Sequence, residues 1–74
     1  MKISERIQRI MKDKGYTNVR LGEKTGKTEQ TLKNTFYRDR HSEKYSLNFA
    51  NVEELVEAMG CEVIIRDKET GKEY

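Results

Sequence analysis

Glycines divide this chain into short segments that look helical. Gly15 and Gly60 follow runs in which apolar residues recur at intervals of three or four, and Gly26 follows a shorter segment that carries Leu21. Glycine readily adopts the left-handed conformation that ends a helix. Proline, which would interrupt such segments, is absent from the sequence. The spacing therefore predicts a mainly α domain built from short helices.

Four helices are predicted from these signals. Their approximate ranges are 4–14, 18–25, 29–38 and 49–60. The residues expected to cap their N-termini are Ser4, Thr17, Thr28 and Asn48, because each side chain can accept a hydrogen bond from the first amides of a helix. Residues 38–48 show no apolar period and are predicted to form a loop.

The last segment, 61–74, changes period. Its β-branched residues cluster at 63–65, a polar turn follows, and Gly71 suits a left-handed position, so the segment is predicted to form a β-hairpin. Val63 and Ile65 would face one side of that hairpin and Ile64 the other, and an isolated hairpin cannot cover both. We therefore expect Val63, Ile64 and Ile65 to form a dimer interface. The alternative is that Ile64 packs on its own helices or stays exposed.

Composition excludes several classes of function. Cys61 is the only cysteine and His41 the only histidine, so a disulfide within the chain and a metal site are both excluded, and no cofactor is expected. Neither a nucleophile with a base partner nor a glycine-rich phosphate loop is present, so the chain is not expected to be an enzyme. The apolar runs are too short for a membrane span, which favours a cytoplasmic protein.

Charge is distributed unevenly along the chain. Residues 1–45 carry twelve basic and six acidic side chains, whereas residues 46–74 carry three and seven. Such an asymmetry indicates that a polyanion meets the first half of the chain. The alternative is an ordinary solvated surface.

The second and third predicted helices have the spacing of a helix-turn-helix. They are joined by a short turn that contains Gly26, and Thr28 begins the second of them. A helix that enters the major groove of DNA needs side chains that can read base edges. The polar residues available for this are Glu29, Gln30, Thr31, Lys33 and Asn34.

The segment "NVRLGEKTGKTEQTL", residues 18–32, resembles the helix-turn-helix of phage repressor and Cro-like regulators, the XRE family. The likeness covers about residues 4–60. It implies a lambda-repressor-like domain of four to five helices over residues 1–60, with 61–74 as a possible dimerisation element. It also implies a sequence-specific transcriptional regulator, such as a prokaryotic phage or mobile-element repressor, that binds double-stranded DNA as a homodimer. The chain departs from the family pattern at Gly22, Thr25, Thr35 and Phe36.

The resemblance implies roles for individual residues. Those expected to contact bases are Glu29, Gln30, Thr31 and Asn34. Those expected to contact phosphates, because of the resemblance or because they flank the third helix and its loop, are Asn18, Lys27, Thr28, Lys33, Arg38, Arg40 and Lys44.

Several of these residues have other interpretations. Glu29 can simply complement the helix dipole. Tyr37 and Tyr45 can contact phosphate or pack over the core, and His41 is expected to be a surface residue of the loop. The same fold also serves antitoxins and adaptor proteins, so a protein partner such as a toxin is the alternative, with the acidic side chains of Glu53, Glu54 and Glu57 facing it. The bland interpretation of those glutamates is a solvated helix face.

Overall fold

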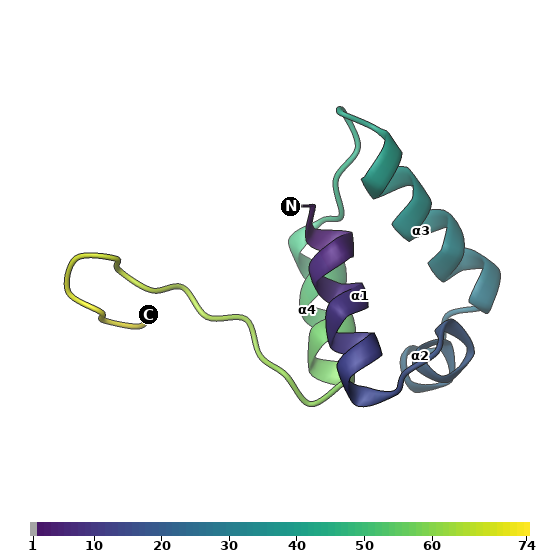
Figure 1. Ribbon diagram of the computed structural model, residues 1–74, viewed down its shortest axis with the longest axis horizontal. Helices are drawn as coiled ribbons and strands as arrows, with labels where there is room; N and C mark the ends of the chain where they lie inside the picture. The colour runs from purple at the N-terminus through teal and green to yellow at the C-terminus, as the bar shows by residue number, and fades with distance from the viewer. Residues whose placement is uncertain (1) are drawn as a thin grey trace.

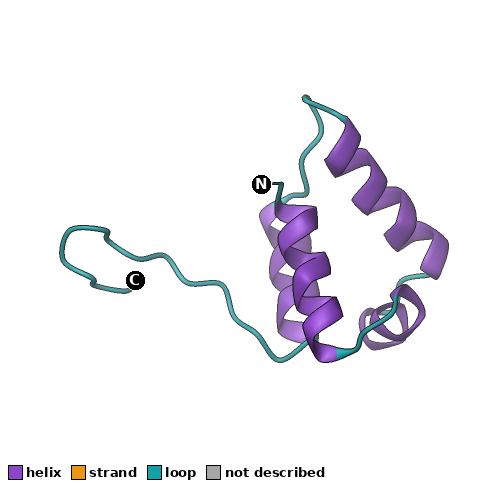
Figure 2. Ribbon diagram, viewed as in Figure 1, coloured by secondary structure: helices purple, strands orange, loops and turns teal. Residues whose placement is uncertain are grey.

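The computed structural model describes residues 2–74, and four helices form its body (Figure 1). Their bounds are Ile3–Lys14 for α1, Asn18–Thr25 for α2, Glu29–His41 for α3 and Phe49–Ala58 for α4. Helix α1 packs on α3 and α4, and α2 packs on the same two helices. No strand forms within residues 2–74, so the chain is mainly α (Figure 2). None of the helices in this part of the chain has the length and apolarity to cross a bilayer.

Three of the four predicted N-caps are confirmed. Thr17, Thr28 and Asn48 each accept a hydrogen bond from the backbone amide three residues further on, at 2.8–3.1 Å. The prediction for Ser4 is wrong, because α1 begins one residue earlier, with Lys2 at the N-cap position and no side-chain cap. Ser4 is instead fully buried inside the first turn.

A buried carboxylate, Asp39, explains both this difference and the length of α3. One carboxylate oxygen accepts from the Ser4 amide at 3.0 Å, and the other accepts from the Leu47 amide at 3.3 Å. Asp39 therefore supplies the acceptor that a cap would have given α1. Burial raises the pKa of Asp39, but its interactions with Ser4 and with the Leu47 amide outweigh burial and hold this pKa below its usual value.

Helix α3 runs to His41, three residues beyond its predicted end, and the loop is correspondingly shorter. The apolar period ends at Phe36 because the next inward position is taken by Asp39, which is only 1% exposed. Hydrophobic spacing could not reveal this turn. The prediction that His41 lies in the loop is therefore wrong.

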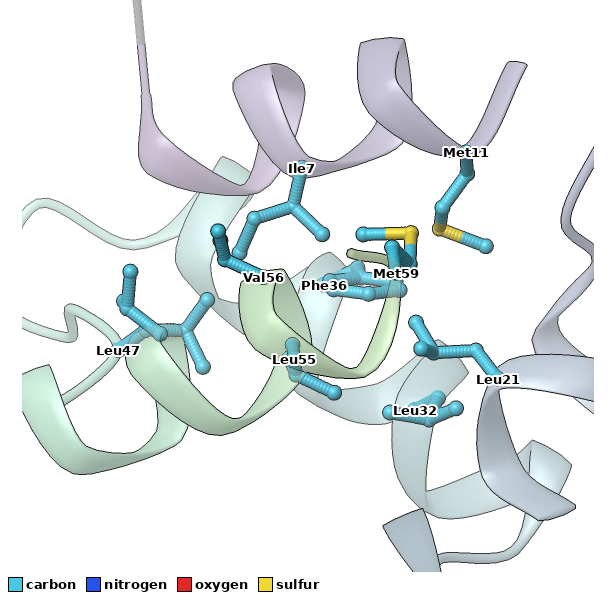
Figure 3. Close-up of a cluster of buried hydrophobic side chains, with 10 residues drawn as sticks. Ile7, Met11, Leu21, Leu32, Phe36, Leu47, Leu55, Val56 and Met59 are labelled. Atoms are coloured by element: carbon cyan, nitrogen blue, oxygen red, sulfur yellow. The ribbon is translucent and has the colours of Figure 1, made fainter. Parts of the chain in front are cut away.

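The core lies between all four helices, and its side chains point toward one another (Figure 3). Phe36 is 3% exposed and belongs to this core. Thr25 satisfies its hydroxyl by donating to the Leu21 carbonyl at 2.9 Å. The buried apolar residues are Ile7, Met11, Leu21, Leu32, Phe36, Leu47, Val52, Leu55, Val56 and Met59.

Gly22 allows the turn after α2 to pass close to the helix. A Cβ atom at this position would lie 2.3 Å from the Lys27 carbonyl oxygen. The Lys27 amide donates to the Gly22 carbonyl at 3.0 Å, so the same approach closes the turn. This glycine fixes how α3 leaves α2.

Residues 61–74 form an arm that extends away from the helical body (Figures 1 and 2). The chain reverses after Asp67, whose carbonyl accepts from the Gly71 amide at 2.9 Å, and Gly71 has the expected positive φ of 76°. Only one bridge, between Arg66 and Glu73, joins the two sides. The predicted β-hairpin is thus limited here to a turn and one bridge, as expected for a hairpin with both faces uncovered.

Candidate nucleic-acid interface

Helix α3 buries one face and exposes the opposite one. Leu32, Phe36 and Asp39 point inward. On the opposite side, residues at intervals of three and four form a continuous exposed row, which we call the α3 ridge. Its members are Gln30, Asn34, Tyr37 and His41.

Two side-chain amides of the ridge form a hydrogen bond with each other. The Gln30 side-chain nitrogen donates to the Asn34 side-chain oxygen at 2.9 Å. Gln30 keeps its own carbonyl oxygen and a second amide hydrogen for another partner, and Asn34 keeps its amide donors. A donor and an acceptor held on one helix face match the edge of an adenine base.

Thr28 and Thr31 stand at the start of α3 and share one hydrogen-bond unit. The Thr28 hydroxyl accepts from the Thr31 amide at 3.0 Å and donates to the Thr31 hydroxyl at 2.8 Å. The Thr28 hydroxyl hydrogen is therefore engaged within the helix. Thr31 is exposed and keeps its own hydroxyl hydrogen for an outside acceptor.

Glu29 forms an ion pair with Lys33 one turn further along α3. The charged groups are 2.9 Å apart, and about half of each side chain is exposed. An exposed pair of this kind stabilises a helix by only a few tenths of a kcal/mol. Its larger effect is on charge, because Lys33 offsets the acidic group at the leading end of the helix.

Some of the basic side chains that were predicted to contact phosphate already have a partner within the protein. Lys27 lies 3.0 Å from the Glu54 carboxylate of α4. Arg40 donates to the side chain of Gln8 in α1. Neither group can reach a phosphate without exchanging or sharing its present partner.

The last turn of α3 and the loop after it each carry one further basic residue of that set, Arg38 and Lys44. The Arg38 guanidinium lies over the Tyr45 ring, 4.4 Å from its centroid, so Tyr45 packs beside a cation at the end of α3. Lys44 is exposed in the loop. Both positive charges remain at the surface, on the same end of the molecule as the C-terminus of α3.

Asn18 meets the middle of α3 across a small hollow. Its side-chain oxygen is buried and has no hydrogen-bond partner within residues 2–74. The hollow brings together three of the predicted phosphate contacts, since Lys33 and Arg40 line it with Asn18. The start of α2 and the basic side of α3 thus form one polar surface.

A second basic cluster surrounds Tyr16, just before α2. Arg20 and Lys24 lie over its ring, 4.5 and 5.2 Å from the centroid. A hydrogen bond with Lys24 lowers the pKa of the Tyr16 hydroxyl, and the neighbouring positive charges act in the same direction. Sequence reasoning assigned neither cation to a site, although their spacing of four on α2 was a usable signal.

The structure also adds two residues to the exposed side of α3. Tyr37 is 64% exposed, which excludes packing over the core, and its ring lies 4.3 Å from that of His41. Tyr37 lies within the predicted range of α3, and His41 joins the ridge because α3 continues to residue 41. With α3 predicted to end at residue 38, His41 could not be placed there.

Comparison of the chain with known protein families, with curated proteins and with solved structures gives no match.

Proposed function

We propose that this protein is a sequence-specific DNA-binding transcriptional regulator of the helix-turn-helix type, in which α2 and α3 form the motif. The observation that carries the proposal is the α3 ridge, a solvent-exposed row of hydrogen-bonding side chains on the helix that follows a tight turn. The lambda-repressor-like architecture and the XRE-family resemblance belong to this proposal. A prokaryotic phage or mobile-element repressor acting in the cytoplasm is the setting that fits them.

In this arrangement α3 lies in the major groove and α2 crosses the DNA backbone. The turn between them is fixed by Gly26, which adopts a φ of 75°, and by the close approach of Lys27 to Gly22. A fixed turn sets the angle at which α3 leaves the protein surface. Gln30 and Asn34 then face the bases from the first half of the helix.

Base reading is assigned to the first two turns of α3. Gln30, supported by Asn34, pairs with an adenine edge, and Thr31 contacts a thymine methyl group or a base acceptor. Glu29 accepts from a cytosine amino group once Lys33 turns to a phosphate. Each good pair of this kind contributes about 1–3 kcal/mol of discrimination.

Phosphate contacts are assigned to two groups. Asn18 and Arg40 line one side of the ridge, and Arg38 and Lys44 lie at its far end. Each phosphate neutralised makes the logarithm of affinity fall with the logarithm of salt by a slope of about 0.9. Lys27 contributes less than the others because Glu54 already binds it.

The proposed active form is a homodimer on two half-sites about one helical turn apart. The arm supplies the contact, because Val63, Ile64 and Ile65 are 39%, 44% and 65% exposed. Burying these residues against a second copy would complete the β-hairpin that the single chain only begins.

The proposal is tested by selecting binding sites from random duplex DNA at two salt concentrations. We expect an enriched sequence with two related half-sites, and an affinity that falls steeply as salt rises. Affinity without an enriched sequence would leave only a general polyanion binder. No binding at low salt would contradict the proposal.

A second candidate is an antitoxin or adaptor that binds another protein. The observation in its favour is on α4, where Phe49 is exposed at the start of the helix and Glu53 and Glu57 are exposed along it. An apolar anchor beside acidic residues suits a basic partner surface. Loss of partner binding in a Phe49→Ser variant, with DNA binding unchanged, would support this second role.

A further inference from the structure

The arm presents an unpaired backbone edge. Within the arm, the Ile65 carbonyl accepts from the Tyr74 amide at 3.0 Å, and the Asp67 amide donates to the Lys72 carbonyl at 2.8 Å. Odd-numbered residues therefore direct their backbone groups to the returning segment. Along an extended chain the alternate residues direct theirs to the other side. Those residues are Glu62, Ile64 and Arg66, and their backbone groups have no hydrogen-bond partner within residues 2–74.

Residues 62–66 are complementary in charge to a reversed copy of themselves. In the sequence "EVIIR", Glu62 and Arg66 are equally distant from the central Ile64. Antiparallel pairing centred on Ile64 sets Glu62 of each copy opposite Arg66 of the other. Opposite charges facing across strands stabilise a sheet, whereas parallel pairing in register would set like charges side by side.

We propose that the arms of two copies pair antiparallel with Ile64 on the two-fold axis, so that the dimer holds a four-stranded sheet. This inference deepens the homodimer of the proposed function and does not depend on DNA binding. The two segments 62–66 form the central strands, and the two returning segments form the edges. Arg66 then lies between Glu73 of its own chain, 3.0 Å away, and Glu62 of the second copy.

The faces of this sheet explain the exposure of the arm. Ile64 of each copy meets its counterpart on one face, beside the two charged rows. The other face carries Val63 and Ile65 of both copies. The three apolar residues that the single arm leaves exposed at 63–65 thus each gain an apolar neighbour from the second copy.

A groove on the helical body continues this second face. It has a volume of about 560 Å³ and lies between α1 and α4, and both Glu62 and Val63 of the arm contribute to its lining. Because Ile65 of the second copy stands opposite Val63, it is the residue placed nearest to the groove. The apolar side chains that would receive it are Ile3, Ile7, Ile10, Val52 and Val56.

The choice of register excludes the neighbouring alternatives. Centring the pair on Val63 or Ile65 would set a charged residue opposite an apolar one, and no ion pair would form between Glu62 and Arg66. Of the centres at residues 63, 64 and 65, only the centre at Ile64 sets Glu62 of one copy opposite Arg66 of the other.

Disulfide trapping tests the register in a Cys61→Ser background, which removes the only native thiol. On the axis, the Cα atoms of the two residues 64 would be about 5.5 Å apart, within the range for a disulfide, whereas those of the two residues 65 would be roughly 7–8 Å apart. Mild oxidation should therefore give a covalent dimer with Ile64→Cys and little with Ile65→Cys. The reverse preference, or no covalent dimer with either, would overturn the register.

Sedimentation of the wild-type chain without DNA tests the dimer itself. Ile64→Lys places two positive charges together on the axis and should raise the dissociation constant of the dimer at least about tenfold. Val19→Lys, at an exposed apolar position on α2, is the matched control and should leave it unchanged. A monomeric wild type would overturn both this inference and the proposed homodimer, yet sequence-specific DNA binding by that monomer would leave the DNA-reading role of α3 standing.

Discussion

The helical body and the arm use the same kinds of residue in opposite ways. In the body, Ile7, Leu21 and Leu32 are fully buried, and even a carboxylate, Asp39, is enclosed with two hydrogen-bond donors. In the arm, Val63, Ile64 and Ile65 remain exposed. The difference shows that β-branched residues alone do not make a core. They need a second layer, which four helices supply to one another and which the arm lacks within a single chain.

The largest expected effect compares a core leucine with an arm isoleucine. Leu32→Ala removes a fully buried side chain of α3, and it should lower the free energy of unfolding by about 2–5 kcal/mol. Ile65→Ala at a concentration where the chain is monomeric should change it by at most about 0.5 kcal/mol. Urea denaturation of both variants measures the contrast. Equal losses would mean that the arm packs on its own body.

Asp39→Asn probes the polar part of the body. The amide keeps one acceptor oxygen but loses the other, so one of the Ser4 and Leu47 amides is left unpaired in a buried site. We expect the free energy of unfolding at neutral pH to fall by about 1–3 kcal/mol. The expected result for the matched control Asp13→Asn, at an exposed position on α1, is no measurable change.

The lowered pKa of Asp39 gives this residue a pH signature. The carboxylate is favoured in the folded state, so its contribution is fully present above the unfolded pKa of about 3.9 and is lost as pH falls through the lower folded pKa. Wild-type stability should therefore decline below about pH 4 more steeply than that of Asp39→Asn. Parallel curves for the two proteins in acid would show that Asp39 does not cause the decline.

A smaller effect separates the basic residues of the interface from those of the arm. Lys44→Ala should reduce the salt slope of DNA binding by about 0.9, because this exposed lysine has no ion-pair partner within residues 2–74. Lys27→Ala should reduce the slope by less, since Glu54 already holds that charge. Lys68→Ala, in the turn of the arm, is expected to leave the slope unaltered. Affinity titrations between low and physiological salt measure all three.

The sequence predicted those elements whose signals are local. Helix α2 has its predicted bounds because Thr17 caps it and Gly26 ends it, and both act within one turn. The end of α3 could not be predicted in this way, because it depends on Asp39 meeting Ser4 across 35 positions of the chain. The spacing of apolar residues does not reveal a buried polar residue whose partner is distant in the sequence.

In the candidate site, too, the features that follow from local position on a helix could be predicted, whereas those that depend on packing between helices could not. The exposure of Gln30, Thr31 and Asn34 follows from their place on a helix whose inward residues are Leu32 and Phe36. The pairing of Lys27 with Glu54 joins two helices and depends on the packing angle between them. His41 entered the ridge only with the additional turn of α3, which again depends on Asp39.

The central claim is that the α3 ridge reads bases, and Gln30→Ala tests it most directly. The variant should be titrated against the selected duplex and against an unrelated duplex at one fixed salt concentration, with Glu57→Ala on α4 as the control. We predict a loss of about 1–3 kcal/mol on the selected duplex and almost none on the unrelated one. An equal loss on both, or no loss on either, would contradict the claim.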